Sequence, residues 1–261
     1  MAKKNKKKKG AGDYLLTLVL LVAIGVFAFA GWKLYGIYMD YKQAKDEYKG
    51  LEELAVQPNP NSPREGEEGT PSSGNEPPIV VDFDALLVEN PDVVGWLYVE
   101  ALGISYPVVQ GTDNEYYLHM TYQKTYNFAG TIFIDYENSR DFQDLNTIVY
   151  GHNMKDGSMF GILKRIVTEN AYANSPYFWM LTPEKNYKYE IFSAYTAQVG
   201  SLTYTLFSKP GKEYTAYLEQ MKANSEIATQ AEPKKFDKVM TLSTCTGDSS
   251  TRFVVQGVRM D

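Results

Sequence analysis

Hydrophobic and polar residues are distributed unevenly along this chain, and their spacing predicts several distinct segments. The first long apolar run extends from Leu15 to Trp32, 18 residues without a charge. At 1.5 Å per residue, a helix of this length spans about 27 Å, close to the roughly 30 Å hydrocarbon core of a bilayer. We therefore expect a membrane-spanning helix over residues 14–36.

Beyond this run, apolar and aromatic residues recur every three or four positions, which is the period of a helix. They are Leu34, Tyr38, Tyr41, Ala44, Tyr48, Leu51 and Ala55. This spacing predicts that the helix continues over residues 37–56 next to the membrane. A coiled-coil dimer is the weaker alternative, because its seam would consist of small residues and tyrosines.

The next segment, residues 57–78, contains six of the twelve prolines and no member of the hydrophobic set. Such a segment cannot bury enough apolar surface to offset the entropy lost on ordering. We expect it to form a disordered, flexible linker to a folded domain over residues 79–261.

Short runs of β-branched and aromatic residues, bounded by turn formers, dominate residues 79–261. Strands are expected at Val93–Val99, Ile104–Val109, Gly130–Ile134, Thr147–Tyr150, Lys188–Val199, Val239–Thr244 and Arg252–Val258. Helices are expected at Phe83–Glu89, Phe160–Val167 and Glu213–Met221. Many short strands with few helices predict a mainly β (α+β) domain, a closed or nearly closed β-barrel with helical insertions.

Charge adds an orientation to the expected membrane helix. Six of the 26 basic residues lie within the first nine positions, where none of the 32 acidic residues occurs. Residues 1–13 are therefore expected to form a basic cytoplasmic tail, with the chain after the membrane helix exported. A cleaved signal peptide is the alternative, because Ala28-Phe29-Ala30 resembles a peptidase site, although the apolar run exceeds the roughly 7 to 15 residues usual there. The acidic remainder argues against a nucleic acid partner.

The chain has one cysteine, Cys245, so no intramolecular disulfide and no multi-cysteine zinc site can form. Cys245 ends one expected strand, and Arg252 opens the next after a short polar turn. Two neighbouring strands would bring the guanidinium near the sulfur, where it could favour a thiolate and donate hydrogen bonds to an oxyanion. An inert buried cysteine is the alternative interpretation.

His152 follows another expected strand, which ends at Tyr150. Histidine suits proton transfer near neutral pH, and the alternative is a histidine that only satisfies hydrogen bonds at a strand end. His119 lacks this setting and is expected at the surface or in a supporting role. Asp135 and Asp248 could orient a base, although aspartates in turns usually only form the turn. No phosphate-binding loop and no histidine pair at metal-ligand spacing occurs, so no cofactor or metal is expected.

Together these motifs resemble the signature of sortases, a family of cysteine transpeptidases. Thr241–Cys245 with the following Arg252 resembles the TLxTC strand, and Tyr150–Asn153 resembles the histidine motif. Other segments resemble the class B branch in the same order: Val94–Leu97, Tyr106–Gln110, Asp113–Leu118, Gly130–Asp135 and Thr205–Asp237. The resemblance covers nearly all of residues 79–261. It implies a sortase-like eight-stranded β-barrel with helical insertions, preceded by a transmembrane helix and a flexible linker.

The resemblance also implies roles for individual residues. Cys245 would be the nucleophile, His152 the proton carrier and Arg252 the oxyanion partner. By position, the residues that would contact the substrate are Asn114, Leu118, Tyr150 and Ser243.

The implied partners are exported proteins that bear a C-terminal sorting signal, NPQTN-like or PxTG-like. The enzyme would cleave the signal after threonine through a thioester and transfer the protein to a peptidoglycan precursor amine. It would act outside the cell, as a single-pass membrane protein with a cytoplasmic N-terminus. The alternatives are a pilin-polymerising sortase with a lysine acceptor, a hydrolytic cysteine peptidase, and a membrane-tethered binding module whose cysteine is structural.

Overall fold

The structure is a computed structural model that describes residues 10–62 and 76–260. The lysines of the expected basic tail, Lys3 to Lys9, and most of the expected linker lie outside these described residues. The chain divides into two compact units, Met1–Gln43 and Ala44–Asp261.

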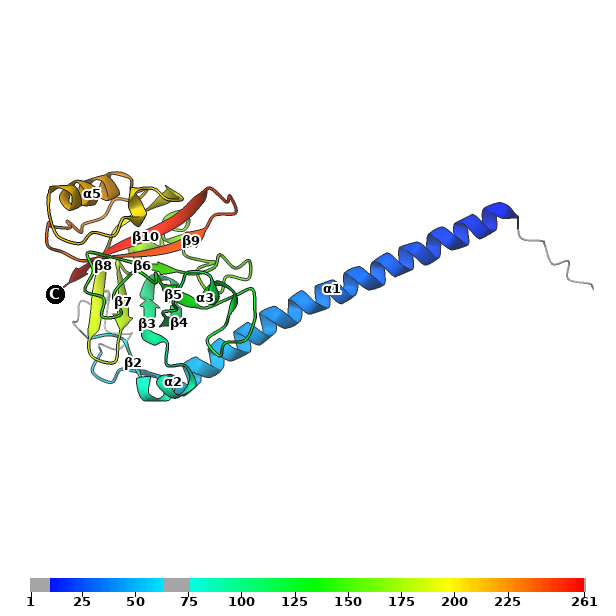
Figure 1. Ribbon diagram of the computed structural model, residues 1–261, viewed down its shortest axis with the longest axis horizontal. Coiled ribbons are helices and arrows are strands. Elements are labelled where there is room, and N and C mark those ends of the chain that lie inside the picture. The colour runs from blue at the N-terminus through cyan, green and yellow to red at the C-terminus, as the bar shows by residue number, and fades with distance from the viewer. Residues whose placement is uncertain (1–9, 63–75, 261) are drawn as a thin grey trace, which may run out of the picture. The chain divides into compact units, whose positions relative to one another are not determined.

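The described part of the first unit is helical and belongs to α1 (Ala11–Ala55), coloured blue at its start in Figure 1. Among the described residues, α1 is the one helix long and apolar enough to cross a membrane. An 18-residue window of it has a mean hydropathy of 2.5 and no buried residue. The helix is uninterrupted over the range 14–36 predicted for the membrane span and over all but the last residue of the extension predicted at 37–56.

The second unit begins with the last turns of α1, which differs from the expected domain start at residue 79. Ala44, Tyr48, Leu51 and Ala55 are 2 to 7% exposed and belong to the core. Their helical spacing puts them on one face, and that face is covered by residues distant in sequence. The periodicity therefore predicted the helix but not which part of it belongs to the folded unit.

Both ends of the expected linker are held in a small sheet. Strand β1 (Val56–Pro58) pairs antiparallel with β2 (Ile79–Val81). Next to this pair, the Asn59 backbone N–H donates to the Pro78 carbonyl over 2.9 Å. These strands were missed from the sequence because each has only three residues and they flank a segment rich in proline.

Eight strands close into a barrel, as expected (Figure 1). They are β3 (Val93–Val99), β4 (Ile104–Val109), β5 (Ile132–Ile134), β6 (Asn146–Tyr150), β7 (Tyr177–Leu181), β8 (Asn186–Gln198), β9 (Val239–Cys245) and β10 (Thr251–Met260). Their order around the barrel is β10-β8-β7-β3-β4-β5-β6-β9, and β10 pairs with β9 to close it. The β4–β5 and β6–β9 pairs are parallel, and the other pairs are antiparallel.

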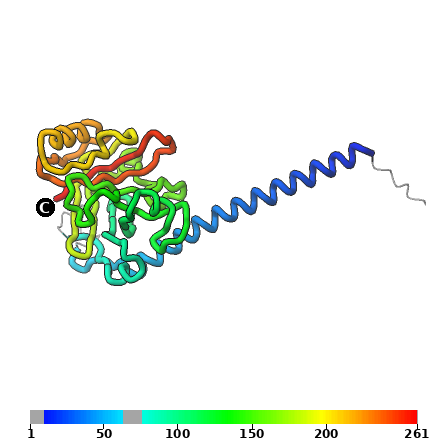
Figure 2. The backbone as a smooth tube through the Cα atoms, in the orientation of Figure 1, coloured from blue at the N-terminus to red at the C-terminus, as the bar shows by residue number. Residues whose placement is uncertain are grey.

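The described helical insertions are short. They are α2 (Phe83–Glu89), α3 (Tyr116–His119), α4 (Arg165–Thr168), α5 (Lys212–Ala223) and three 3₁₀ turns at Glu100–Leu102, Ala171–Ala173 and Leu202–Tyr204. Figure 2 shows α5, in orange, beside the red C-terminal strands. The buried face of α5 packs on the outer side of the barrel, in a cluster with residues of β8, β9 and β10. Its members on α5 are Tyr214, Tyr217, Leu218 and Met221.

Two predictions of local structure were wrong or incomplete. Strand β7 was missed because Tyr177–Leu181 is almost entirely buried, so it lacks the alternation that marks a half-exposed strand. The expected helix Phe160–Val167 is mostly a series of turns, with α4 starting only at Arg165. Bonds over three residues, such as Leu163 N–H to the Phe160 carbonyl, produce the apolar spacing without an α-helix.

Candidate active site

Strands β9 and β10 bring Cys245 and Arg252 together. The two residues are direct partners across this antiparallel pair, and directly opposed side chains lie on one face with Cβ atoms about 4.5 to 5.5 Å apart. The thiol is free and half-buried. The guanidinium Nη1 donates to the carbonyls of Ser249, at 3.2 Å, and Thr251, at 2.8 Å. These bonds hold the cation at the strand end that carries the sulfur.

The turn between these strands is organised by Asp248. Its Oδ1 accepts hydrogen bonds from the Ser250 backbone N–H and from the Ser250 hydroxyl, both over 2.8 Å. These bonds lower the pKa of the Asp248 carboxyl. Asp248 is thus a turn former, the role that its position favoured.

The parallel pairing of β6 with β9 carries His152 to the same edge of the barrel. Tyr150, the last residue of β6, lies opposite Ser243. Parallel strands end on the same side, so the chain after Tyr150 leaves the barrel where β9 reaches Cys245. The Asn153 side-chain amide then donates to the Cys245 carbonyl over 2.8 Å. The structure therefore brings the histidine segment to the cysteine strand, as the sequence hypothesis required.

The glycine before His152 is required by packing. A Cβ on Gly151 would lie 2.7 Å from the Phe160 ring, closer than real carbon contacts allow. Glycine therefore fits here, where its N–H donates to the Ser243 carbonyl of β9 over 3.1 Å.

The imidazole of His152 is held by a backbone carbonyl. Its Nε2 lies 2.7 Å from the Leu118 oxygen. A carbonyl can only accept, so Nε2 carries a proton and Nδ1 is the nitrogen free to exchange one. Burial lowers the pKa of His152 below its ordinary value of 6.5. The Leu118 hydrogen bond opposes this shift, and the nearby His119 charge adds to it. His119 itself is exposed, with its ring centroid 6.5 Å from that of His152.

Asp135 holds two of the expected substrate-contacting residues rather than the histidine. Its Oδ2 accepts hydrogen bonds from Asn114 Nδ2 and from the Tyr150 hydroxyl, both over 2.9 Å. Asp135 is buried, with 6% of its surface exposed. Burial raises the pKa of Tyr150, and the negative charge of Asp135 adds to this effect. The proposed role of Asp135 in orienting a base is therefore replaced by one of organising Asn114 and Tyr150.

Sequence reasoning missed Tyr204, which lies in the 3₁₀ turn Leu202–Tyr204. Its hydroxyl lies 2.9 Å from Ser243 Oγ. Burial raises the pKa of Tyr204, the Ser243 hydrogen bond and the Arg252 charge oppose this, and Cys245 adds to it. Tyr204 therefore lies close to the candidate site. No motif around Thr203-Tyr204-Thr205 could have revealed it, because the turn reaches the site only through tertiary folding.

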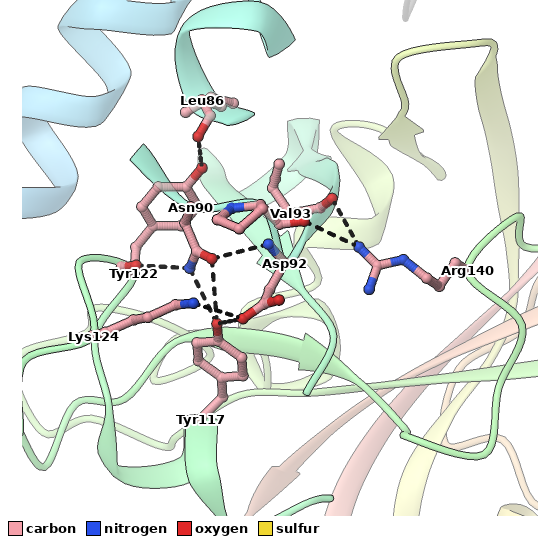
Figure 3. Close-up of polar contacts among 9 residues, drawn as sticks. Leu86, Asn90, Asp92, Val93, Tyr117, Tyr122, Lys124 and Arg140 are labelled. Carbon is pink, nitrogen blue, oxygen red and sulfur yellow. Dashed lines mark hydrogen bonds and ion pairs between the residues drawn. The ribbon is translucent and has the colours of Figure 1, made fainter. Parts of the chain in front are cut away.

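A polar network fixes α3, the helix that supplies the Leu118 carbonyl (Figure 3). The Tyr117 hydroxyl donates to Asp92 Oδ2 over 2.6 Å. Lys124 Nζ lies 2.9 Å from the same carboxylate oxygen, and the Asn90 side-chain amide donates to the Tyr117 hydroxyl over 3.1 Å. The ion pair and hydrogen bonds lower the pKa of Asp92 despite the opposing effect of partial burial. Leu118 thus comes directly after Tyr117, whose side chain is held in place by this network.

No group of three or more histidine, cysteine, aspartate or glutamate side chains within the described ranges is arranged to hold a metal ion. The groups that converge at this barrel edge are a thiol, an imidazole and a guanidinium, with a buried carboxylate beside them. A nucleophile, a proton carrier and a permanent cation are the parts needed for acyl transfer.

Known proteins resemble this chain over most of its length. The family model described as Sortase domain matches residues 97–260. A sortase B of Listeria monocytogenes is 33% identical over 248 residues, covering 94% of this chain and 96% of that relative.

Solved structures are similar as well. The crystal structure of sortase B from Bacillus anthracis in complex with AAEK1 has a TM-score of 0.70 and 32% identity, covering 86% of this chain and 99% of that one. A Staphylococcus aureus sortase B–substrate complex has a TM-score of 0.64 and 29% identity, covering 69% and 84%. The likeness spans the barrel and the motifs together, and this chain therefore belongs to the sortase family of transpeptidases, in its class B branch.

Proposed function

We propose that this class B sortase attaches exported proteins to a peptidoglycan amine, with Cys245, His152 and Arg252 as its catalytic residues. The observation that carries the proposal is the direct pairing of Cys245 with Arg252. This pair lies at the barrel edge where the chain leaves β6 just before His152. This arrangement lets one substrate carbonyl meet the sulfur and the guanidinium at once.

In the first half of the reaction, the Cys245 thiolate attacks the carbonyl carbon of threonine in a sorting signal. The oxyanion that forms accepts hydrogen bonds from Arg252, whose charge is permanent. Before the attack, the Cys245 thiol gives its proton to Nδ1 of His152, and the imidazolium then gives this proton to the leaving amine as the C–N bond breaks. The product is a thioester between Cys245 and the exported protein, and the released peptide carries a new amino group.

In the second half, an amine attacks the thioester carbon. Because burial lowers the pKa of His152, its imidazole is neutral near pH 7 and can accept the proton of this amine. The Cys245 thiolate leaves, and one amide has been exchanged for another. We assign the amine to a peptidoglycan precursor, and a pilin lysine is the competing acceptor in the assay below.

For the substrate, we propose an NPQTN-like or PxTG-like signal held by residues around Asp135 and Ser243. The contacting residues are Asn114, Leu118, Tyr150 and Ser243. Support comes from the similar Staphylococcus aureus sortase B, which was solved as a substrate complex. The hydrogen bonds of Asn114 and Tyr150 to one buried carboxylate also favour a preformed peptide groove.

We propose that α1 anchors the enzyme in the cell membrane with its N-terminus in the cytoplasm and its barrel outside. The lysine cluster before the apolar run supports this orientation. Cys245 is the only cysteine, so a membrane-impermeant maleimide tests the topology in intact cells. Labelling of the wild type, with none in Cys245→Ala, is expected. Labelling only after lysis would place the barrel inside.

The catalytic proposal is tested with the full chain in lipid nanodiscs, sorting-signal peptides of both types and mass spectrometry. Without an amine, the Cys245 thioester should accumulate. With a peptidoglycan-type amine it should convert to an amide. Cys245→Ala should abolish all product, and His152→Ala and Arg252→Ala should nearly do so.

The possible outcomes separate the alternatives. Cleavage that proceeds equally well without an amine would identify a hydrolase. Preference for a lysine peptide would identify a pilin-polymerising sortase. Product formed by Cys245→Ala would show that the nucleophile is wrongly assigned.

A further inference from the structure

The last turns of α1 insert one tyrosine into the catalytic unit. Tyr48 is 7% exposed. Its hydroxyl donates to the Gly130 carbonyl over 2.6 Å and lies 3.1 Å from Thr131 Oγ1. A buried hydroxyl with two partners specifies position more strictly than apolar packing does. Tyr48 is distant in sequence from the proposed catalytic residues, yet two chains of contacts lead from it to His152.

The first chain of contacts passes through Gly130 to the Leu118 carbonyl. Gly130 has a φ of +57°, and a Cβ there would lie 2.7 Å from the Leu118 oxygen. The backbone that Tyr48 holds is therefore packed directly against the carbonyl that contacts His152 Nε2. Thr131 strengthens this path, since its N–H donates to the Tyr117 carbonyl over 3.0 Å. A shift of the Tyr48 hydroxyl would be transmitted to the hydrogen-bond acceptor of the imidazole.

The second chain of contacts passes through Tyr106 to the backbone of His152. The rings of Tyr48 and Tyr106 meet edge to face, with centroids 5.4 Å apart at 85°. The Tyr106 hydroxyl accepts a hydrogen bond from the Met159 N–H over 3.1 Å. The next residue, Phe160, donates its N–H to the His152 carbonyl over 3.0 Å. One tyrosine thus supports His152 from the imidazole side and from the backbone side.

We propose that Tyr48 is a positioning residue for His152, so that the end of α1 is a working part of the catalytic unit as well as its connection to the apolar segment. Tyr48 acts through Leu118 and Met159 and touches no reacting atom. It holds Nε2 on the Leu118 carbonyl and thereby keeps Nδ1 aimed for proton exchange. This inference rests on the proposed role of His152 in catalysis.

The test uses the full chain in nanodiscs and two conservative variants. Tyr48→Phe removes the hydroxyl but keeps the ring, so it breaks the first chain of contacts alone. Tyr106→Phe removes the acceptor of the Met159 N–H and so weakens the second. We expect each variant to lower kcat about 10-fold, with KM for the signal peptide unchanged, because small misplacement of a catalytic group costs up to about 100-fold in rate. In Tyr48→Phe, the His152 Nε2 proton should also exchange faster with water, as followed by NMR.

Tyr214→Phe is the matched control. The Tyr214 hydroxyl is also buried and donates to two carbonyls, those of Leu145 at 2.9 Å and Asp237 at 2.7 Å. It belongs to the cluster under α5. We expect this variant to lose thermal stability like Tyr48→Phe but to keep wild-type kcat and wild-type exchange of the His152 proton.

The inference is overturned if Tyr48→Phe matches Tyr214→Phe in kcat and in proton exchange. If Tyr48→Phe does not fold, the inference is tested by Tyr106→Phe, which leaves α1 unchanged. A lower kcat with unchanged KM in this variant supports the inference, and wild-type kcat overturns it. Activity retained by His152→Ala would defeat the catalytic proposal instead. In that case, the exchange of the Nε2 proton in Tyr48→Phe would still report whether Tyr48 positions the ring.

Discussion

The hydrogen bond from Tyr150 to Asp135 offers a quantitative test of how the candidate site is organised. The Asp135 carboxylate is 6% exposed and accepts three hydrogen bonds, from Asn114 Nδ2, the Tyr150 hydroxyl and the Glu137 backbone N–H. A hydrogen bond to a charged group contributes roughly 1.5 to 3 kcal/mol. Tyr150→Phe removes one of the three, so we expect the free energy of unfolding to fall by about 2 kcal/mol. For a domain of this size, that loss lowers Tm by roughly 4 to 8 °C.

The measurement is urea and thermal unfolding of the full chain, followed by near-UV circular dichroism. A double-mutant cycle with Asp135→Asn isolates the pair, because the contribution of the Tyr150 hydroxyl depends on the negative charge it meets. We expect a coupling energy of about 1 to 2 kcal/mol. Tyr136→Phe is the control, since Tyr136 is 48% exposed and should change stability by less than about 0.5 kcal/mol.

The reasoning would be refuted if Tyr150→Phe were as mild as Tyr136→Phe. It would also be refuted if the effects of Tyr150→Phe and Asp135→Asn simply added. Either result would mean that water replaces the hydroxyl without loss, so the carboxylate would not organise this part of the site.

Three further predictions concern catalysis, pH and packing. Arg252→Lys should lower kcat about 100-fold or more in the peptide assay, with Tm unchanged, because an ammonium lacks the planar donor fork that stabilises an oxyanion; near-wild-type kcat would argue against the assigned role. Because burial lowers the pKa of His152, the unfolded chain binds this proton more readily. Stability should therefore fall as pH drops below 6.5, and urea unfolding should show less of this loss in His152→Gln; equal losses would contradict it. Leu218→Ala, at a 2% exposed position under α5, should cost about 2 to 5 kcal/mol in urea unfolding, whereas Glu219→Ala on the exposed face should cost under about 0.5 kcal/mol.

Local sequence patterns were informative where one segment carries its own signal. The run before Cys245 is apolar and ends in polar residues, and it forms β9 as expected. The helical spacing around Tyr214 likewise corresponds to α5. The pattern failed at Tyr177–Leu181, which is buried almost throughout, and at Phe160–Val167, where repeated turns imitate helical spacing.

The candidate chemistry was visible in the sequence because thiol, imidazole and guanidinium groups are few and stand at the ends of apolar runs. The short turn between their strands already predicted that Arg252 lies near Cys245, but the approach of His152 was not visible, because it depends on pairing between distant segments. The parallel register that places Tyr150 opposite Ser243 brings His152 to Cys245, and no local pattern specifies which strands become neighbours. The residues that hold the site in place, such as Tyr204 and Tyr48, could not be identified from the sequence for the same reason.

The amino-acid sequence by itself determined the apolar helix, the strand-rich character of the domain and the candidates for the reactive side chains, since these follow from periodicity and functional groups along one segment. Only the tertiary structure decided that Asp135 holds Asn114 and Tyr150, that Leu118 offers its carbonyl to His152, and that Tyr48 reaches Gly130. Each of these contacts joins residues far apart in the chain. Such contacts form only when barrel closure brings their backbones together, because hydrogen bonds depend on distance and direction in space rather than on sequence spacing.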